Sequence, residues 1–387
     1  MTTLADGPSL LAGARLAEAV EWRRHLHRNP ELSFQEHETS AFVEETLRSF
    51  GLETRRPTPT SVVATLRNGT GRTIALRADI DALPIDEESG VEFASTRPGV
   101  MHACGHDMHT ATLLAVARTL SERRSELAGE VRFVFQHAEE QLPGGAQELV
   151  AAGVVDGCDA VVGCHVFSGE PAGTIAVSDG AFMAAADFFE LTVRGKGGHG
   201  AMPNLSIDPV VCAAEIVLAF QSIVTRELSP LARAVITTAT LRTDSTRGNV
   251  IPEQVELGGT VRTFDQEVRE HVAAAMGRIA ESVAAAHRCT AELDYQWGYA
   301  PTVNDLEVAA LVRRNVPAGR LHEIEPTMGG EDFSAYGAAA PACFFIAGAG
   351  GPGAFPHHHP RFVVDEAAMP AAHDTFVGTV LDFLRAG

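Results

Sequence analysis

The sequence predicts an α/β protein: a main domain built on a mostly parallel mixed sheet, interrupted by a smaller inserted α+β lid domain. Three observations predict this class. Apolar strand-like runs alternate with helical runs in the first half of the chain, two long alanine-rich helical runs lie between alternating strands in its middle, and the α/β pattern returns near its end. The length of 387 residues is sufficient for two domains.

The elements of the first half follow from periodicity and from stop signals. An amphipathic helix is predicted over residues 10–26, ended by Asn29-Pro30, and a second over 36–50, stopped by Gly51. Apolar runs at 61–66 and 73–78 predict two strands, and Asn68-Gly69 between them predicts a hairpin. The remaining predictions are a helix over 108–127, a strand over 131–136, a short helix near Gln147 and a strand over 160–164.

The middle of the chain has a different pattern. Strands are predicted over 187–194, 234–241 and 255–262, and helices over 207–228 and 264–287. This pattern indicates one sheet backed by two helices. After residue 295 a strand over 343–347 and a closing helix over 371–384 restore the α/β pattern. The predicted division is residues 1–182 plus 297–387 for the main domain and 183–296 for the insertion, which has an ordinary domain size.

Composition excludes several classes of function. The formal net charge is −20, which is opposite in sign to the basic surface of a nucleic-acid-binding protein or of a protein bound to an anionic membrane. Residues 1–6 lack the basic start of a secretory signal, and no run of 18 uncharged apolar residues is present, so neither secretion nor a membrane span is expected. Six cysteines in such a chain favour reduced thiols and a cytoplasmic location.

Polar side chains follow the predicted strands at the points where they end. Asp79 and Asp81 follow one strand, Glu139 and Glu140 another, and His165 a third. Ligands of open α/β sheets collect beyond the carboxyl ends of the strands, so these groups are expected to converge.

The segment from His102 to His109 offers one thiol and three imidazoles near the start of a predicted helix. Sulfur and nitrogen donors together suit zinc and neighbouring transition metals. The alternative is a buried cysteine beside histidines that hydrogen-bond within the core. Three imidazoles so close together are hard to satisfy in that way, so metal binding is favoured.

Glu139 and Glu140 are adjacent, and in an extended chain their side chains point in opposite directions. One carboxylate could then bind metal while the other handles protons; the alternative is a solvated acidic turn. His165 could equally be a core histidine. The three histidines between Pro356 and Pro360 could be a solvated tract without a role.

These stretches resemble the M20 metallopeptidase family, and specifically its amidohydrolase branch of hippurate and auxin-conjugate hydrolases. The resemblance covers nearly the whole chain, in the order of the family's motifs. The matching stretches are residues 76–84 (LRADIDALP), 102–107 (HACGHD), 138–140 (AEE), 195–201 (GKGGHGA), 249–252 (NVIP), 329–333 (GGEDF) and the final histidine-proline segment.

The resemblance implies a metal-dependent amidohydrolase that cleaves N-acyl amino acids, such as N-acetyl or hippurate-like conjugates, through a hydroxide held between two divalent metal ions. The ions would be manganese, zinc, cobalt or nickel. Glu139 would be the general base. His358 is selected over His357 and His359 because the family's last ligand lies two residues before the proline, and His137 stands where relatives usually carry proline. The implied ligands are Cys104, His106, Glu140, His165 and His358.

The resemblance also implies roles for residues of the insertion. His199 would stabilise the oxyanion, in its own subunit or in a neighbouring one, while Asn249 and Arg262 would hold the substrate carboxylate, for which a forked guanidinium is suited. The alternatives are a loop histidine, a turn asparagine and a surface arginine. A homodimer or higher homo-oligomer through the lid is expected, with a small molecule as the other partner.

Three competing functions remain open from the sequence. A dipeptidase, carboxypeptidase or aminopeptidase could use the same metal centre. A non-catalytic metal-binding protein could keep the scaffold. A cysteine hydrolase could use Cys104 with a nearby histidine, without any metal.

Overall fold

The computed structural model describes residues 7–385, and its chain divides into two compact units. The larger unit contains the chain up to Gly180, Val303–Glu325 and the chain from Asp332 onward. The inserted unit contains Ala181–Thr302 and Pro326–Glu331. Residues 181–182, 297–302 and 326–331, which the sequence-based division assigns to the main domain, therefore lie in the inserted unit. Residues 1–6, which entered the expectation of no secretory signal, lie outside the described residues.

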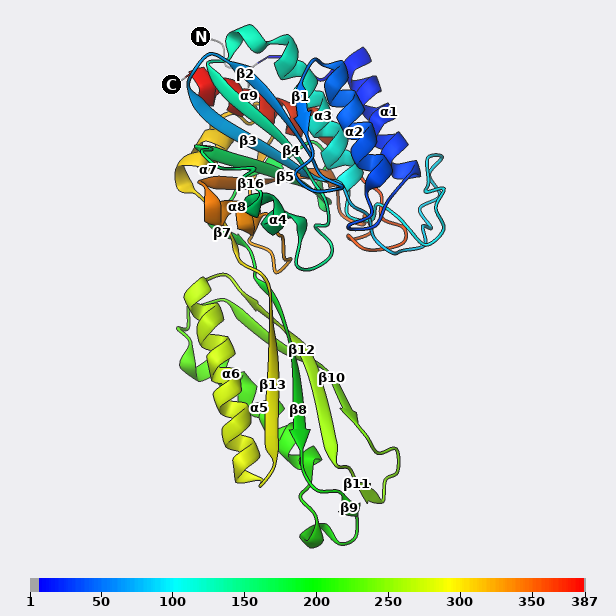
Figure 1. Cartoon of the computed structure of the whole chain (residues 1–387), viewed down its shortest axis with the longest axis vertical. Coiled ribbons are helices and arrows are strands. Elements are labelled where there is room, and N and C mark those ends of the chain that lie inside the picture. Colours follow the sequence, from blue (N-terminus) through cyan, green and yellow to red (C-terminus); the bar gives the residue numbers. More distant parts are fainter. Residues whose placement is uncertain (1–6, 386–387) are drawn as a thin grey trace. The chain divides into compact units, whose positions relative to one another are not determined.

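The larger unit is built on an eight-stranded mixed sheet (Figure 1). β3 pairs in parallel with both β4 and β5, and β16 pairs in parallel with β5, while β2 is antiparallel to β1 and β4. In spatial order the strands are β1 (Glu53–Arg55), β2 (Val62–Asn68), β4 (Gly129–Gln136), β3 (Arg72–Asp79), β5 (Ala160–Pro171), β16 (Ala342–Gly350), β6 (Ile175–Ala176) and β15 (Leu321–His322).

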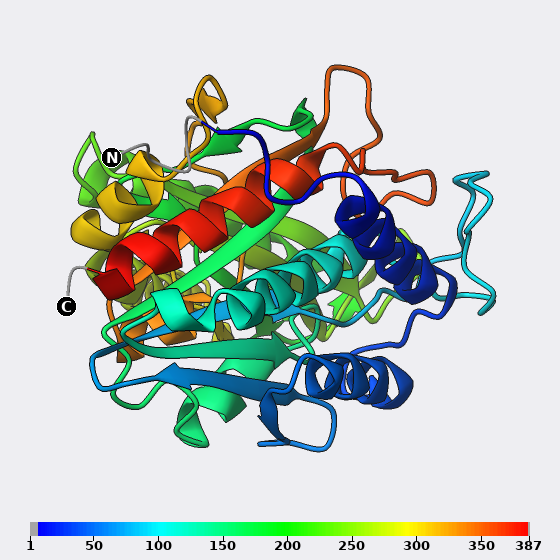
Figure 2. The same ribbon diagram turned by 90° about the horizontal axis from the view of Figure 1, so that it is seen from above.

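Seven α-helices surround this sheet in the part of the chain from residue 7 to 385. They are α1 (Ala14–Arg28), α2 (His37–Ser49), α3 (His106–Glu122), α4 (Gly145–Ala151), α7 (Leu306–Arg314), α8 (Ser334–Ala339) and α9 (Ala368–Arg385), with a short 3₁₀ turn η2 at Arg124–Glu126. α3 and α9 run side by side across one face of the sheet (Figure 2). The central strands are buried on both faces, which explains why they read as continuous apolar runs instead of alternating ones.

The register of the central strands brings the polar residues to one edge. β3 pairs Asp79 with Gln136 of β4 and Arg77 with Gly163 of β5. His165, two residues beyond Gly163, therefore lies level with Asp79. β3 and β4 thus end next to each other, while β5 continues to Pro171, so His165 lies within β5 and does not follow its end as the sequence predicted.

The hairpin predicted at Asn68-Gly69 is wrong, because the two strands that flank it, β2 and β3, do not pair with each other. The chain does reverse there, but β4 lies between β2 and β3 and pairs with both. Gly129, at the start of β4, is opposite Asn68 on one side and Arg72 on the other. A Cβ at Gly129 would lie 2.3 Å from the Arg72 carbonyl oxygen, so glycine allows β4 to enter between the two strands. The turn signal is local and cannot report a third strand.

The inserted unit is a four-stranded antiparallel sheet with two helices packed on one face (Figure 1). Its apolar core lies between the sheet and the helices. In spatial order the strands are β10 (Ala234–Thr243), β12 (Gln254–Thr263), β8 (Ala186–Arg194) and β13 (Thr290–Tyr299). The helices are α5 (Pro209–Ser222), which continues into a π-turn η4 (Ile223–Glu227), and α6 (Gln266–Ala286).

A short ribbon continues from the end of this sheet. β9 (Gly198–His199) follows β8 and pairs with β11 (Val250–Ile251), which precedes β12, and a 3₁₀ turn η3 (Pro203–Leu205) lies between β9 and α5. We call this ribbon with the loops at residues 195–206 and 244–253 the tip. The chain passes between the two units at β7 (Gly180–Met183) and β14 (Thr302–Asn304), and again on either side of Pro326–Glu331.

One helical stretch in residues 7–385, Pro209–Glu227, meets the length and composition of a membrane span, with a mean hydropathy of 1.4. Part of it belongs to the core of the inserted unit, where Cys212, Ile216 and Phe220 are fully buried. Two of its other apolar side chains face outward: Val211 is 55% exposed and Leu218 is 74% exposed. A helix that packs into a core passes the same test, so length and composition alone do not make it a span.

Candidate metal centre

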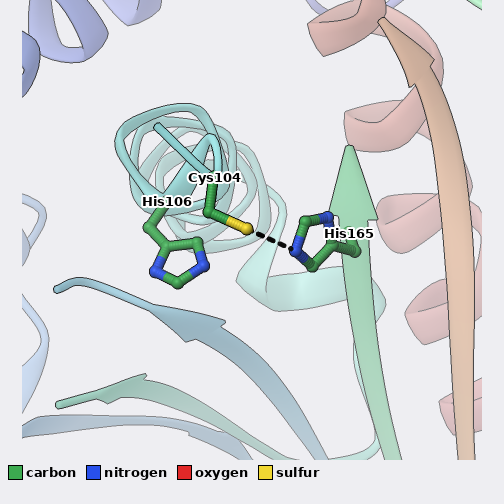
Figure 3. Close-up of side chains that lie close together, drawn as sticks. All are labelled: Cys104, His106 and His165. Carbon is green, nitrogen blue, oxygen red and sulfur yellow. Dashed lines mark hydrogen bonds between the residues drawn. The ribbon is translucent and has the colours of Figure 1, made fainter. Parts of the chain in front are cut away.

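Cys104 and His106 are brought together by the turn that starts α3. Gly105 between them has φ 92°, in the left-handed region, and a Cβ there would lie 2.4 Å from the Val166 side chain. Figure 3 shows both side chains at the start of α3, with His165 reaching toward them from β5. The Cys104 sulfur lies 3.4 Å from His165 Nε2, and all three side chains are buried.

Hydrogen bonds fix which nitrogen of each imidazole is available. His165 Nδ1 lies 2.8 Å from the Val166 carbonyl oxygen, and His106 Nδ1 lies 3.0 Å from the Asp81 carbonyl oxygen and 3.1 Å from its carboxylate. Both Nδ1 atoms therefore carry the proton and donate it. This leaves each Nε2 as the ring atom that can face a metal, which is how proteins orient metal-binding histidines. His106 Nε2 is buried and has no hydrogen-bond partner among the described residues.

His109 lies close to Asp79 and His106, but both of its nitrogens are already used. Nδ1 lies 2.6 Å from an Asp79 carboxylate oxygen, and Nε2 accepts a hydrogen bond of 2.8 Å from the Val166 backbone. His109 therefore holds the Asp79 carboxylate and the Val166 backbone through hydrogen bonds, and it offers no lone pair to a metal. His102 is also buried, and burial lowers its pKa to about 4, so it is neutral at neutral pH. His102 has two buried ring nitrogens without hydrogen-bond partners but belongs to no ligand group among the described residues, so His106 is the imidazole of the segment that presents a nitrogen to the site.

A buried ion network supports Asp79 from behind. Arg77, only 1% exposed, forms ion pairs with Asp79 at 2.7 Å and with Asp332 at 2.8 Å, and donates to the Gln136 side chain. Burial opposes ionisation of Asp79, but the nearby His106, His109 and Arg77 outweigh it and hold its pKa well below the usual range. The sequence interpretation gave Arg77 no role, although an arginine inside an apolar strand was a visible signal of a buried partner.

Glu139 and Glu140 both reach the same place, so the expectation that they point in opposite directions is wrong. Ligand atoms of His106, Glu139 and Glu140 lie within 4.8 Å of one another. The strand ends at Gln136, and Ala138 has φ 49°, so the alternation of an extended chain does not apply here. The backbone N–H of Glu140 donates to the Asp81 carboxylate at 3.0 Å.

The three consecutive histidines near the C-terminus occupy different environments. His358 Nε2 lies 3.2 Å from a Glu140 carboxylate oxygen, and a possible ligand set joins His358 with Glu140 and Cys104. His357 lies behind, with Nδ1 3.7 Å from the Cys104 sulfur and Nε2 accepting from the Ser168 backbone at 3.4 Å. His359 Nδ1 accepts from the Arg361 backbone and its ring stacks on Phe355. The geometry favours His358 as the ligand among the three.

The electrostatics of the centre fit a cation. Burial disfavours charge on His106, but the carboxylates of Asp79, Asp81 and Glu140 outweigh it and raise its pKa to about 10. A centre that draws a proton so strongly holds an excess of negative charge, which a divalent ion would neutralise. The donors are one thiol, three imidazoles and carboxylates, a set suited to borderline transition metals. Two of the ligand groups, Cys104–His106–His165 and Cys104–Glu140–His358, share the sulfur, which is compatible with two adjacent ions.

The Cys104 thiol is a poor candidate for a nucleophile. Burial raises its pKa well above the ordinary value, and the charges of Glu140 and Glu139 raise it further. Reactive cysteines have lowered pKa values and electropositive surroundings, which is the opposite situation. A bound cation would instead stabilise the thiolate as a ligand.

His199 and Asn249 lie together in the tip. β9 pairs His199 with Val250, and the Gly200 backbone donates to the Asn249 carbonyl oxygen at 2.8 Å. His199 Nδ1 accepts from the Ala201 backbone at 3.1 Å, so the proton is on Nε2, which is left as a hydrogen-bond donor. Both residues line an open hollow of about 680 Å³. The pair is thus exposed, and His199 presents an N–H group.

Arg262 is not near this pair within one chain. Gln254 begins β12 opposite Arg194, at the tip, whereas Arg262 lies eight residues further along, opposite Val235. At about 3.4 Å per residue the two ends are roughly 27 Å apart. The Arg262 guanidinium is half-buried and donates to the carbonyl oxygens of Asp187 and Val261. A single small substrate cannot contact Arg262 and the His199–Asn249 pair of the same chain.

Comparisons with known proteins agree with this geometry. Residues 75–382 match the model of peptidase family M20/M25/M40. The chain is 51% identical over 289 residues to an N-acyl-L-amino acid amidohydrolase of Geobacillus stearothermophilus, covering 74% of this chain and 78% of the relative. It is 41% identical over 359 residues to thermostable carboxypeptidase 2 of Saccharolobus solfataricus, covering 90% and 91%. A crystal structure of a dinuclear metal-binding M20 peptidase of Bacillus subtilis superimposes with a TM-score of 0.85 at 37% identity, covering 96% and 98%.

Proposed function

The chain belongs to peptidase family M20/M25/M40, and we propose that it hydrolyses the amide bond of N-acyl amino acids at a centre of two divalent metal ions. The observation that carries this proposal is the meeting of sulfur, imidazole and carboxylate donors beside Glu139. The proposed metal ligands are Cys104, His106, Glu140, His165 and His358.

The reaction adds water across the amide carbonyl and breaks the C–N bond. The metal ions, when bound, polarise the carbonyl and make a water molecule acidic. Glu139, 6% exposed and next to His106 and Glu140, takes a proton from the attacking water. It then gives that proton to the leaving nitrogen, so that the amino acid departs as an amine and the acyl group as a carboxylate.

Two divalent ions would offset the negative charge of the centre. The five proposed ligands bring two negative charges, the Cys104 thiolate and Glu140, against the four positive charges of two divalent ions, so the ligand shell with its ions sums to +2. Asp79, Asp81 and Glu139 lie beside this shell and lower that charge. The formal charge of −20 belongs to the whole chain, and salt screens its exposed part beyond about 10 Å.

We propose that His199, Asn249 and Arg262 bind the substrate across two copies of the chain. His199 presents an Nε2–H that suits a developing oxyanion, and Asn249 and Arg262 suit the substrate carboxylate. Because β12 separates Arg262 from the tip by roughly 27 Å, one substrate can contact both only if the tip serves a second chain. The exposed apolar residues Val211, Leu218 and Leu241 of the inserted unit supply a surface for such a homodimer.

Mixing two inactive variants tests the shared site. A Glu139→Gln chain keeps its His199, and a His199→Ala chain keeps its Glu139. In a mixed dimer one site combines both intact residues, so coexpressed or subunit-exchanged mixtures are expected to regain a measurable fraction of wild-type activity. Mixtures that stay as inactive as either variant alone, while size-exclusion and mass analysis show mixed dimers, would contradict the shared site.

One set of assays identifies both the native metal and the preferred acyl group of the substrate. The mixed donor set accommodates manganese, zinc, cobalt or nickel, and we propose that the native ion is one of these four. The stripped protein is reloaded with each metal and assayed with N-acetyl amino acids, hippurate and dipeptides. Faster turnover of the N-acyl amino acids is expected. Preference for unblocked dipeptides would favour the second candidate, a peptidase, which the similarity to a carboxypeptidase supports.

The six cysteines are consistent with a cytoplasmic location, which we also propose. All six are free thiols. A protein of an oxidising compartment more often pairs its cysteines. Fractionation of the source cells with an antibody against the chain would test this location.

A further inference from the structure

Glu36 is a buried carboxyl group whose side chain does not cap the helix it precedes. It occupies the N-cap position of α2, but α2 receives no side-chain cap hydrogen bond from it. Its side chain is fully buried, and its Oε1 accepts two backbone N–H groups instead. These come from Phe34 at 3.0 Å and from Ala138 at 2.8 Å. One oxygen atom thus links the segment before α2 to the segment that carries Glu139.

Both residues bound by Glu36 have an unusual backbone. Phe34 has φ 66° and Ala138 has φ 49°, in the left-handed region that residues with a Cβ seldom adopt. Ala138 is fully buried, so its N–H has no access to solvent and needs a protein acceptor. Such conformations persist only where the surroundings over-determine them. Glu36 supplies part of that constraint.

The rest of the segment is fixed on the other side of Glu139. The Ala138 carbonyl oxygen accepts from the Gly145 backbone at 3.0 Å, and the Glu140 N–H donates to Asp81 at 3.0 Å. A Cβ at Gly145 would lie 2.0 Å from the His137 carbonyl oxygen, so this contact requires glycine. Glu139 therefore stands between two residues whose backbones are held, and Glu36 is the acceptor that holds the first.

We propose that Glu36 is a positioning residue for the reaction: by accepting the Ala138 and Phe34 N–H groups it sets the direction of the Glu139 carboxylate. The proposal rests on the function proposed above, in which Glu139 is the general base. Glu36 itself is not assigned any contact with substrate or metal.

Glutamine is a suitable replacement for the test. Burial, with the nearby charge of Asp81, raises the pKa of Glu36 to about 7, so its carboxyl group is partly neutral at neutral pH. The side-chain oxygen of Glu36→Gln can accept the same two N–H groups. Glu36→Ala removes the acceptor, and Glu36→Asp keeps the charge but withdraws the oxygen by one methylene. A positioning role predicts wild-type-like behaviour only for glutamine.

Glu31 provides a matched control. It is 6% exposed and lies in the same segment, and its carboxylate accepts the backbone N–H groups of Glu38 and Thr39 in the first turn of α2. Its side chain thus anchors α2, and among the described residues its carboxylate contacts Glu38, Thr39 and Arg97 and not the segment around Ala138. Glu31→Ala should lower stability without changing kcat of the folded, metal-loaded enzyme.

The experiment measures kcat, KM, bound metal and amide hydrogen exchange for the holoenzyme and its variants. For Glu36→Ala we expect kcat to fall about 100-fold, as a misplacement of about 1 Å can cause, with KM and two bound metal ions retained. Exchange in the peptide containing Ala138 should be faster in Glu36→Ala than in Glu31→Ala. Glu36→Gln should stay within a few-fold of wild type.

Several results would overturn the proposal. These are a folded Glu36→Ala with wild-type kcat, a Glu36→Gln as impaired as Glu36→Ala, or an equal loss of kcat in Glu31→Ala. If Glu36→Ala does not fold, the kcat values of Glu36→Gln and Glu36→Asp are compared instead. The proposal requires a higher kcat for Glu36→Gln than for Glu36→Asp. Wild-type protein that turns over no N-acyl amino acid would instead reject the function itself, so the two failures are distinguishable.

Discussion

The metal centre and the tip of the inserted unit carry the same kind of polar residues but are built in different ways. At the metal centre His106 is 1% exposed and its Nδ1 is fixed by Asp81, while His165 is fixed by the Val166 carbonyl oxygen. At the tip His199 and Asn249 are both exposed, and a two-residue strand holds His199. The metal centre is therefore preorganised within one chain, whereas the tip presents exposed donors, which we propose serve a site on a second chain.

Replacement of Glu139 tests the metal centre, which is the preorganised region of the two, and should cause the largest loss of kcat. Glu139→Gln keeps the size and burial of the side chain but cannot take a proton from water. We expect kcat to fall by about 10³ to 10⁴, toward the upper end for loss of a general base. Metal content, measured by elemental analysis, should not change. Near-normal turnover would remove Glu139 from the mechanism.

Replacement of His199 tests the tip. Removing one oxyanion donor typically lowers kcat by about 10² to 10³, and we expect His199→Ala to fall in this range. Because His199 is exposed and remote in sequence from the ligands, the melting temperature and the bound metal should stay at wild-type values. A variant that loses metal together with activity would show that the tip supports the centre structurally.

The pH dependence of stability tests the burial of Glu36, which holds the chain segment before Glu139 at the metal centre. The pKa of Glu36 is raised from 4.5 to about 7 by burial, so its proton is bound more tightly in the folded state. Its stabilisation is fully present below about pH 4.5 and is lost as pH rises through about 7, by about 3 kcal/mol. The difference in unfolding free energy between wild type and Glu36→Gln, measured in urea from pH 5 to 8, should follow this curve. A difference that is constant with pH would contradict the burial argument.

The smallest effect is expected at His137, the departure from the family pattern next to the base. His137 is buried, and its Nε2 lies 3.1 Å from Glu148, whose side chain is 48% exposed. Because exposed partners contribute at most about 1 kcal/mol, Glu148→Ala should change stability by less than that and kcat by less than about threefold. A larger loss of kcat would show that His137 orients the neighbouring base.

The sequence predicted much of the centre because its chemistry is local to strand ends and to short motifs. Cys104 and His106 flank one glycine, Glu139 and Glu140 follow a strand that is readable as an apolar run, and His165 lies at the end of another apolar run. Relations between distant segments were not readable. The position of β4 between β2 and β3 depends on Gly129, and the common direction of Glu139 and Glu140 depends on the bend of the chain beyond the end of β4.

Two long-range relations of the site also had no signal in the sequence. Glu36 and Ala138 are 102 residues apart, and only the folded chain brings them together. Asn249 and Arg262 are close in sequence, but Asn249 lies in the tip before β12 begins, whereas Arg262 lies near the far end of β12. Distance along the chain therefore did not predict distance in the fold. An extended strand separates residues that are close in sequence, and the edge of a sheet brings together residues that are distant in sequence.

Metal titration of the stripped protein tests the central claim most directly. Manganese, zinc, cobalt or nickel is added in steps while bound metal and hydrolysis of an N-acetyl amino acid are recorded, for wild type and for Glu139→Gln. The account predicts that both proteins bind two equivalents and that only wild type gains activity. Full activity of the stripped wild-type protein, or binding of fewer than two ions with full activity, would contradict it.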